Sequence, residues 1–581
     1  MDELDRWSRK WSMTLNVDKT RVMIFGKQGA EVSILSEGIK VKQINDMKYL
    51  GVVLDERLDF NAQAEHAAAK ARRAFFKVSR LIDGRKGISV GTGIQLYKSL
   101  VSPHLEYAIP VWANMSEKSV KLLEKVQSQC LRTVTGAMAN SSSDALDVIC
   151  NVTPIRIRIA EINNREISKI LSKCPDSVIR ETFEETKMTE RNTTPMAHLM
   201  VTGKEFRRSI KGYEVEREYI RTSEDVLEKF KIDEIDIVKG IGNSKNRTED
   251  QKQLGRTLVK EYVEQNKHRH LIVFTDGSVQ DGAVGKTSCC AVIVNPDGDN
   301  IWEAEVVGDF SNNVEAELHG IGKAVELGTK YLEEHDHQFK SICVLSDCRA
   351  AIDLAVKYSR VTEHNMAIGR LKRGVLAAKS LGKRVMVAWV PGHAGVDQNE
   401  VADEQAKAVL KSPFQAPKSE LSLRTCGKVC REMGKRTWQR RWDRGTTGRY
   451  THNLMPQVGK KKMMPALRGE GVAYCRLLLN STLLLEHQKM KKIEATSTCD
   501  CNTAIEGVSH FLIECPLYNE CRTQMYSEIL EVWEGVRSAG HLNVTAEFLL
   551  APEESNQMST DAAIMVSRAV FKYIKMTKRL I

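Results

Sequence analysis

Two apolar runs that each end on an aspartate constrain this chain more than any other feature of its sequence. Residues 271–276 read LIVFTD and residues 341–347 read SICVLSD, each with the length and composition of a buried β-strand. A helical pattern lies between them, which predicts a crossover connection between parallel neighbouring strands. Ligands of α/β sheets bind beyond the carboxyl ends of such strands, so we expect Asp276 and Asp347 to converge there.

Two more acidic residues are candidates for the same edge of the sheet. Taken alone, an aspartate followed by glycine is typical of a turn, and the second strand-end acid argues against that reading of Asp276. In the helical stretch 312–328, Glu317 borders the apolar face and is expected to point inward, whereas Glu315 lies farther round. A solvated glutamate is the alternative. Asp403 lies in the opening turn of the helix after AWVPGHAG, where helix-dipole complementation alone also favours aspartate.

Four carboxylates at one sheet edge predict bound cations. Without cations these groups would repel one another and raise one another's pKa values. Oxygen ligands without histidine or cysteine favour Mg²⁺ or Mn²⁺ over zinc. Two such ions about 4 Å apart form the clamp used for phosphodiester displacement, in which one activates water and the other stabilises the leaving oxygen. We therefore expect two divalent ions and a phosphodiester substrate.

Four motifs in this segment carry a family resemblance. FTDGS (274–278), EAELHGI (315–321), VLSDCRAAI (344–352) and VPGHAGVDQNEVADEQAK (390–407) resemble, in order and spacing, the signature blocks of a type 1 ribonuclease H. The resemblance implies a mixed five-stranded sheet with flanking helices over 268–412. It also implies divalent-metal-dependent cleavage of the RNA strand of RNA–DNA hybrids.

The resemblance assigns roles to individual residues. It implies four magnesium ligands, Asp276, Glu317, Asp347 and Asp403. His393, in the PGHAG loop, would assist water positioning or product release, although a lone loop histidine is usually a surface residue. Contacts with the hybrid would come from Ser278, Asn312 and Asn313.

Two other functional readings compete with an active ribonuclease H. One is a nucleic-acid-binding remnant whose nuclease no longer turns over. The other is an integrase or exonuclease with the same sheet. It is disfavoured because the PGHAG loop and the NEVAD helix occur together.

The N-terminal part resembles the end of the palm and the thumb of a non-LTR retrotransposon reverse transcriptase. The resemblance rests on LDRWSRKWSMTLNVDKTRVMIFGK (4–27), MKYLGVVLDERLDF (47–60) and LYKSLVSPHLEYAIPVWAN (96–114). It implies that Lys19 is the palm lysine and that YLGV forms the primer-grip hairpin. No paired-aspartate turn precedes Trp7, so DNA polymerase activity is not expected.

The C-terminal part contains a Cys/His set and a basic stretch. In CDCNTAIEGVSHFLIECPLYNECR (499–522), three thiols and one imidazole make a tetrahedral zinc set of Cys499, Cys501, His510 and Cys515. The C-x-C opening is tighter than the common spacing, but the segment resembles the Cys/His knuckle that ends such retrotransposon polyproteins. The stretch 424–453 interleaves basic and aromatic residues, which predicts nucleic-acid contacts at Trp438, Arg440 and Arg441. An ordinary helix that buries Trp438 and Trp442 is the equal alternative.

The composition of the chain indicates its partners and its cellular location. A net charge of +11 over 581 residues suits a polyanionic partner, and RNA–DNA hybrid, RNA or DNA is expected. The 14 cysteines lack the spacing of a disulfide scaffold, and neither a signal peptide nor a membrane span is visible. We therefore expect a nuclear or cytoplasmic protein that does not enter a membrane.

We read the chain as the C-terminal portion of a retrotransposon polyprotein, with a fold that is multidomain α/β. The predicted order of its parts is a polymerase palm-end and thumb remnant (1–155), a connection (156–267), the ribonuclease H domain (268–412), a basic helical tether (413–494), a zinc knuckle (495–525) and C-terminal helices (526–581).

Overall fold

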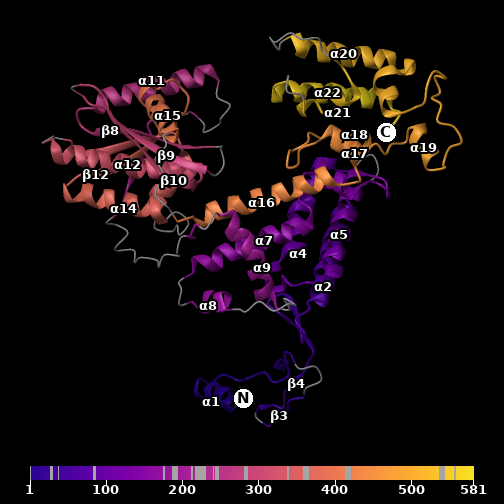
Figure 1. Cartoon of the computed structure of the whole chain (residues 1–581), viewed down its shortest axis with the longest axis horizontal. Helices are drawn as coiled ribbons and strands as arrows, with labels where there is room; N and C mark the ends of the chain where they lie inside the picture. The colour runs from indigo at the N-terminus through magenta and orange to yellow at the C-terminus, as the bar shows by residue number, and fades with distance from the viewer. Residues whose placement is uncertain are drawn as a thin grey trace. The chain divides into compact units, whose positions relative to one another are not determined.

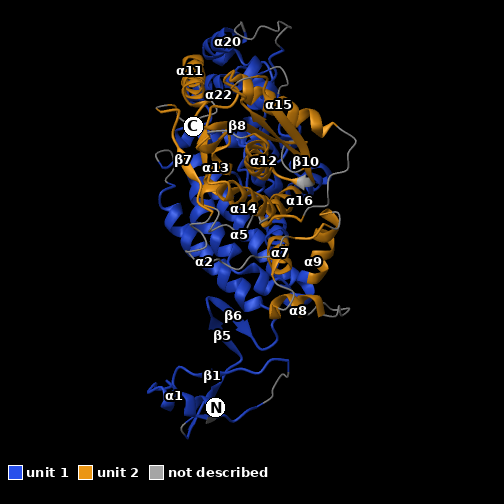
Figure 2. Cartoon of the chain, turned by 90° about the vertical axis from the view of Figure 1, so that its left-hand side faces the viewer, with its two compact units in different colours: residues 1–163, 188–199, 433–581 blue, residues 164–187, 200–432 orange. Residues whose placement is uncertain are grey.

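The fold is taken from a computed structural model of the chain. It describes residues 2–26, 31–36, 38–82, 87–173, 177–185, 194–210, 213–215, 230–239, 241, 248–280, 285–296, 298–335, 339–357, 365–411, 420–534, 543–554 and 558–581. Contacts divide the chain into two compact units, coloured separately in Figure 2. Unit 1 comprises 1–163, 188–199 and 433–581, and unit 2 comprises 164–187 and 200–432. The predicted linear domain borders stay predictions, because these units join segments that are distant in sequence.

A six-stranded mixed sheet forms the centre of unit 2. Its strands are β7 (Asp233–Ile235), β8 (Leu271–Val279), β9 (Gly285–Ile293), β10 (Ile301–Ser311), β11 (Ser341–Ser346) and β12 (Arg384–Trp389). Their order across the sheet is β10-β9-β8-β11-β12-β7. β10, β9 and β8 pair antiparallel, whereas β8, β11, β12 and β7 pair parallel. The predicted parallel pairing of the two acid-bearing strands is confirmed, with Thr275 opposite Ser346.

Helices cover both faces of this sheet (Figure 1). The helices of the unit are α8 (Val178–Glu185), α11 (Glu249–Asn266), α12 (Asn313–Glu334), α13 (Arg349–Lys357), α14 (Asn365–Ser380) and α15 (Asp397–Leu410). α12 and α14 lie on one face, and α11 and α15 lie on the other. Side chains alternate accordingly, since Ile342 lies near Gly328 of α12 while Cys343 contacts Tyr262 of α11. This period of two buries the strands on both sides.

The sheet has one strand more than the five that the sequence predicted. β7 comes from the segment expected to be a connection, pairs with β12 and is tied by an ion pair of 2.5 Å between Glu234 and Arg349. α11 comes from the same segment, begins at a capping box of Thr248 and Gln251, and buries Val259 in the core of the sheet domain. Parts of the predicted connection, including 216–229 and 242–247, lie outside the described residues.

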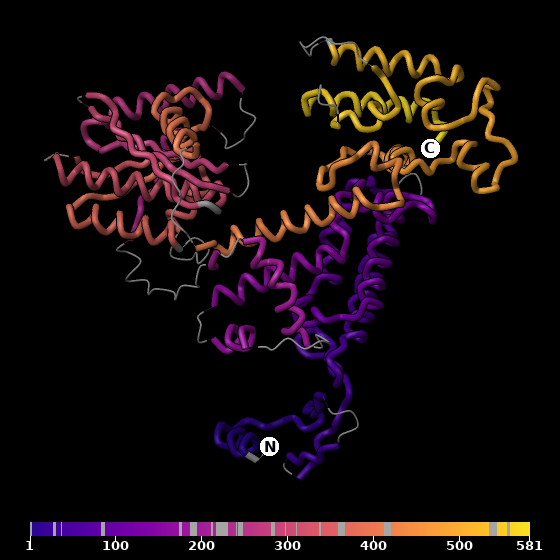
Figure 3. Tube along the Cα trace, in the orientation of Figure 1, coloured from indigo at the N-terminus to yellow at the C-terminus, as the bar shows by residue number. Residues whose placement is uncertain are grey.

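Unit 1 is built mainly from helices around a separate core. Its elements are α1 (Asp2–Lys10), β1 (Arg21–Val22), β2 (Leu35–Ser36), β3 (Ile39–Lys40), β4 (Lys42–Gln43), β5 (Asp46–Tyr49), β6 (Val52–Asp55), α2 (Asn61–Ser79), α3 (Val90–Leu96), α4 (Ser102–Glu106), α5 (Glu117–Thr135), α6 (Ser143–Ile149), α17 (Arg449–Leu454), α18 (Arg468–Leu478), α19 (Leu485–Met490), α20 (Asn519–Glu534), α21 (Ala546–Leu550) and α22 (Thr560–Thr577). Figure 3 traces α20 and α22 side by side near the C-terminus. Three helices have residues in both units: α7 (Ile155–Ser172), α9 (Pro195–Ser209) and α16 (Leu423–Arg444).

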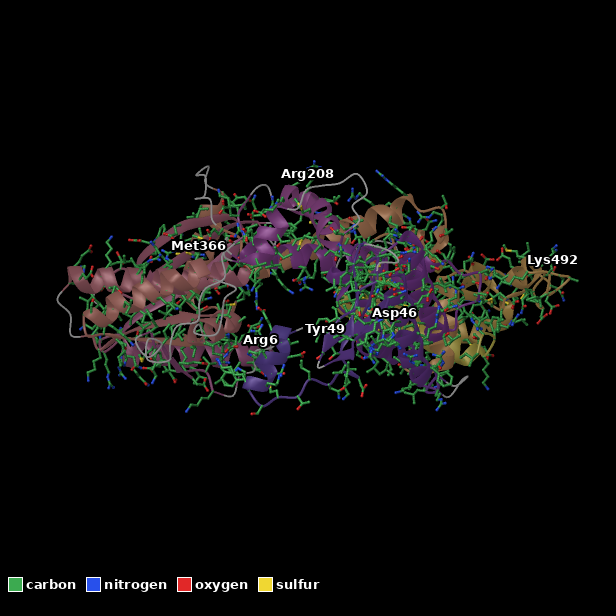
Figure 4. The ribbon with its side chains drawn as sticks, turned by 90° about the horizontal axis from the view of Figure 1, so that it is seen from below. Arg6, Asp46, Tyr49, Arg208, Met366 and Lys492 are labelled. Carbon is green, nitrogen blue, oxygen red and sulfur yellow. The ribbon has the colours of Figure 1, made fainter. Side chains whose placement is uncertain are left out.

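The hairpin predicted around YLGV is present in unit 1. β5 begins at Asp46 and ends at Tyr49, both exposed and both labelled in Figure 4, and it pairs antiparallel with β6. Leu50 and Gly51 turn the chain with φ values of 46° and 89°. The Tyr107 hydroxyl donates to the Leu50 carbonyl at 2.8 Å, which holds this left-handed turn. Its role as a primer grip stays a prediction.

No helix in the part of the chain that the structure describes combines the length and the apolar character needed to cross a membrane.

Candidate metal centres

Three carboxylates meet at one edge of the unit 2 sheet. Asp276 lies in β8, Asp347 directly follows β11, and Glu317 lies in the second turn of α12. One oxygen of each lies within 4.8 Å of the others. β8 continues three residues past Asp276 to Val279, so this aspartate lies within its strand rather than at its end. The predicted inward orientation of Glu317 agrees with its burial at 8% exposure.

Two glycines permit this close approach. A Cβ atom at Gly277 would lie 2.3 Å from the backbone of Ala316 and Glu317, so α12 packs directly on β8. A Cβ atom at Gly392 would lie 2.2 Å from Oδ2 of Asp347. Any larger residue would push the strand, helix and loop apart. The glycines of the FTDGS and PGHAG motifs therefore shape the site directly.

The electrostatics of the cluster favour a bound cation. Burial, followed by the charges of Asp347 and Asp403, raises the pKa of Asp276 to about 8. Burial, followed by Asp276 and Asp347, raises the pKa of Glu317 well above its usual range. Among the described residues, the buried Oε2 of Glu317 has no hydrogen-bond partner. A set of hard oxygen donors with an unpartnered buried oxygen fits a divalent ion such as Mg²⁺ or Mn²⁺.

Asp403 lies beside this group rather than within it. Its carboxyl is hydrogen-bonded to Asp276 and forms an ion pair of 2.6 Å with Lys407, one turn along α15. The 4.8 Å group found among the described residues holds the other three acids. α15 begins at Asp397, so Asp403 lies in its second turn, not in the opening turn that the sequence indicated. Helix-dipole complementation therefore explains this residue less well than its contact with Asp276.

His393 lies in the loop between β12 and α15. Its side chain is exposed, and its φ of 52° is left-handed, which is uncommon for a residue with a side chain. Gly392 of the same loop packs against Asp347. Of the residues predicted to contact a hybrid, Ser278 is half-buried and Asn313 is exposed. Their contacts stay predictions.

The predicted hybrid contact at Asn312 is wrong. This side chain is fully buried and caps α12, with Oδ1 accepting from the amides of Val314 and Glu315. Its Nδ2 donates to the hydroxyl of Thr425 at 2.9 Å. These bonds occupy the amide group, so it cannot reach a nucleic acid.

Glu315 also differs from its predicted position. It is 6% exposed and therefore as buried as Glu317. Its carboxylate accepts hydrogen bonds from Ser422 and, at 2.7 Å, from Thr425. It lies between the N-termini of α12 and α16, a placement that stabilises its charge. Sequence reasoning missed Ser422 and Thr425, because they follow more than 100 positions later.

The structure decides between the two readings of the basic stretch. Trp438 is 4% exposed and Trp442 is 1% exposed, and both belong to the core of unit 1. The prediction that Trp438 contacts nucleic acid is therefore wrong, because a buried ring cannot stack on a base. Arg441 forms an ion pair of 2.7 Å with Asp144. Arg440 is exposed, and its contact with nucleic acid stays a prediction.

The predicted zinc residues also meet, in unit 1. Atoms of Cys499, Cys501, His510 and Cys515 lie within 4.8 Å of one another. The Sγ atoms of Cys499 and Cys515 are 3.6 Å apart, and Sγ of Cys501 is 3.3 Å from Nε2 of His510. The Thr503 hydroxyl is the main cause that lowers the pKa of Cys501 to about 6, whereas burial raises the pKa of Cys499 to about 12. Three sulfurs and one imidazole at these distances fit a zinc ion.

The surroundings of this cluster show that it is part of a larger helical core. The carbonyl of Cys515 accepts from Arg522 at 2.6 Å, and Tyr573 of α22 donates to the carbonyl of Phe511. Nδ1 of His510 lies 3.6 Å from Glu514, which is longer than a hydrogen bond. Cys521 lies outside the cluster and packs against the core. The sequence offered no signal for Arg522 or Tyr573, because their partners are backbone carbonyls.

Comparison with known proteins agrees with the geometry of unit 2. Residues 268–411 match the family model of RNase H. This part of the chain is therefore an RNase H domain.

The chain is further similar to the probable RNA-directed DNA polymerase from transposon X-element of Drosophila melanogaster. The two are 28% identical over 131 residues, which is 22% of this chain and 14% of that protein. The RNA-directed DNA polymerase from mobile element jockey of Drosophila funebris is 24% identical over 181 residues, 31% of this chain and 20% of that protein. The matched segments thus span at most about a fifth of these relatives. The predicted resemblance to a non-LTR retrotransposon polyprotein with an RNase H domain is confirmed.

Solved structures of RNase H1 proteins also match. RNase H1 from the halophilic archaeon Halobacterium salinarum NRC-1 has 20% identity, covers 24% of this chain and 97% of its own, and gives a TM-score of 0.18. LC11-RNase H1, solved in complex with an RNA/DNA hybrid, has 16% identity, covers 24% of this chain and 96% of its own, and gives a TM-score of 0.20.

Proposed function

We propose that this chain hydrolyses the RNA strand of RNA–DNA hybrids in a divalent-metal-dependent reaction. Support comes from the RNase H match over 268–411 and from the convergence of Asp276, Glu317 and Asp347. The observation that carries most weight is the buried, unpartnered oxygen of Glu317 between two further acids. Such an arrangement is expensive unless a cation neutralises it.

The residues of the candidate site would have different roles in this reaction. Asp276, Glu317 and Asp347 would hold Mg²⁺ or Mn²⁺, with Asp403 completing the set beside Asp276. When bound there, two such ions would supply an activated water and stabilisation of the leaving oxygen. His393 is exposed on the adjacent loop, where it would assist water positioning or product release.

The test is a cleavage assay with the purified chain. We expect a labelled RNA–DNA hybrid to be cut in magnesium, to leave 5′-phosphate ends and to stay intact in chelator. Asp276→Asn is the matched control, because it keeps the volume of the side chain but removes a charge. If the well-folded chain binds the hybrid and never cleaves it, the alternative of a catalytically silent binding remnant is correct.

We propose, as a second function of the chain, that the tail binds one zinc ion through Cys499, Cys501, His510 and Cys515. The mutual approach of these four side chains supports it. Elemental analysis of the full chain tests it.

A further inference from the structure

Helix α11 contacts the loop that carries His393. This helix lies before the RNase H match, which begins at residue 268. Nε of Arg256 donates to the carbonyl of Ala394 at 2.8 Å. The guanidinium also packs on Gly395, where an added Cβ atom would lie 2.0 Å from Nη2 of Arg256. Gly395 has a φ of 74°, so the loop backbone turns under the arginine in a conformation that suits glycine.

Two further contacts hold the same loop at its ends. At its start, Gly255 lies so close to Pro391 that an added Cβ atom would be 2.7 Å from Cγ of the proline. After the loop, Lys260 forms an ion pair of 3.3 Å with Asp397, the first residue of α15. α11 therefore touches the loop before, at and after its turn.

α11 itself is fixed on the sheet domain. Val259 and Val263 are buried in its core, and the hydroxyl of Tyr262 lies 3.5 Å from Sγ of Cys343 in β11. The helix starts at a complete capping box. Figures 1 and 2 show α11 on the same face of the sheet as α15. A helix anchored in this way can hold a loop in place.

The opposite side of the loop faces the carboxylate cluster. Gly392 packs against Oδ2 of Asp347, and Nε1 of Trp389 donates to the carbonyl of Asp347 at 2.9 Å. His393 itself has a left-handed backbone conformation, which persists only when neighbouring contacts hold it. The loop is thus enclosed between α11 and a candidate metal ligand.

We propose that α11 is a clamp on the His393 loop and that Arg256 is its positioning residue. Arg256 acts through the backbone of Ala394, not by contact with the substrate. The inference deepens the proposed function and rests on it, because the loop serves hybrid cleavage. It also means that the working nuclease begins at α11, ahead of the segment that matches the family.

Hydrogen exchange in the full chain tests the clamp without any need for nuclease activity. In Arg256→Ala, amides of residues 392–397 should exchange about fivefold faster, as expected for the loss of one net hydrogen bond. Arg256→Lys keeps a donor and should restore part of the protection. Lys252→Ala is the matched control, because Lys252 lies on the same helix and pairs with Glu249 at the surface. Unchanged exchange in Arg256→Ala overturns the clamp.

A double-mutant cycle on hybrid cleavage tests the positioning role. Arg256→Ala should lower kcat by no more than His393→Ala does, and the double variant should be no slower than His393→Ala alone. KM and the magnesium dependence should not change. Additive losses, or a raised KM with altered salt dependence, would mean that Arg256 contacts nucleic acid, and either result would overturn the proposal. A wild-type rate in Arg256→Ala would also overturn it. Absence of cleavage by the wild-type chain refutes the proposed function, while the exchange measurement still decides the clamp.

Discussion

The chain contains two candidate metal centres that are assembled in opposite ways. The carboxylate centre takes Asp276 from a strand, Glu317 from a helix and Asp347 from the position after a second strand, so the whole sheet domain must fold before the acids meet. The Cys/His cluster draws its ligands from one short segment, with Cys499 and Cys515 only 16 positions apart. One centre is therefore positioned by tertiary structure and the other mainly by local chain geometry.

This difference predicts what each ion contributes. In the carboxylate centre the fold is already made, and a cation relieves repulsion among acids whose pKa values are raised. In the Cys/His cluster a bound zinc ion would replace protons on the thiols and close a loop, so its binding would add directly to the free energy of unfolding. Loss of a ligand should cost activity in the first centre and stability in the second.

The largest expected effect is that of Asp276→Asn on hybrid cleavage. We expect the rate in magnesium to fall by about 10³-fold, because a charged ligand is lost from the ion clamp. Folding should be retained or improved, since asparagine replaces a group whose charged form is costly because of burial and the nearby Asp347. Single-turnover rates and circular dichroism measure both. An equal rate in the variant would remove Asp276 from the mechanism, and an unfolded variant would contradict the contrast between the two centres.

Cys501→Ser should have the next largest effect, on stability. Zinc content should fall from one ion per chain to none. The free energy of unfolding should fall by an amount on the order of several kcal/mol. That is less than the ~10–16 kcal/mol typical of zinc-finger peptides, because α20 and α22 also support the segment. Elemental analysis and limited proteolysis measure the change. Cys521→Ser is the control, since it lies outside the cluster and should keep its zinc. If hybrid cleavage depended on Cys501, the two centres would not act independently.

Thr425→Val should have a smaller effect and lower the free energy of unfolding by about 1–3 kcal/mol. The substitution removes one hydrogen-bond partner from the buried carboxylate of Glu315 and one from the amide of Asn312. The measurement is the thermal unfolding midpoint of the full chain. Thr437→Val, at an exposed position of α16, should leave the midpoint unchanged. Equal midpoints for both variants would show that the support around α12 is dispensable.

The smallest effect concerns the pH dependence of the metal-free chain. The pKa of Asp276 is about 8 when folded, mainly because of burial, and about 3.9 when unfolded. Between these values the folded protein holds a proton that the unfolded chain has released, so the free energy of unfolding falls as the pH rises. Asp276→Asn should show a shallower fall from pH 5 to pH 8, measured by urea unfolding in chelator. An identical slope in both proteins would show that the proton retained by the folded protein is held by another group and not by Asp276.

The fold around the candidate site could be predicted where the pattern is periodic. The runs at 271–276 and 341–347 have the composition of buried strands, and the apolar spacing of α12 singles out Glu317. The same reasoning failed at Asn312, because a cap and a groove contact call for the same polar residue. It failed at Glu315 because the face of a helix does not reveal which distant segment will cover it. β7 was missed because three residues carry too little periodicity.

The sequence by itself therefore determined the kinds of centre this protein can hold. Acids that follow apolar runs, glycines beside them and a spaced Cys/His set are local features, and their chemistry selects hard or soft cations without reference to packing. Tertiary structure alone decided which side chains are free to act. Trp438 and Trp442 lie in the core rather than on a surface, and Arg256 lies on the His393 loop, 138 positions from its acceptor. The physical reason is that burial and long-range hydrogen bonds depend on which segments meet, and the order of residues does not encode that locally.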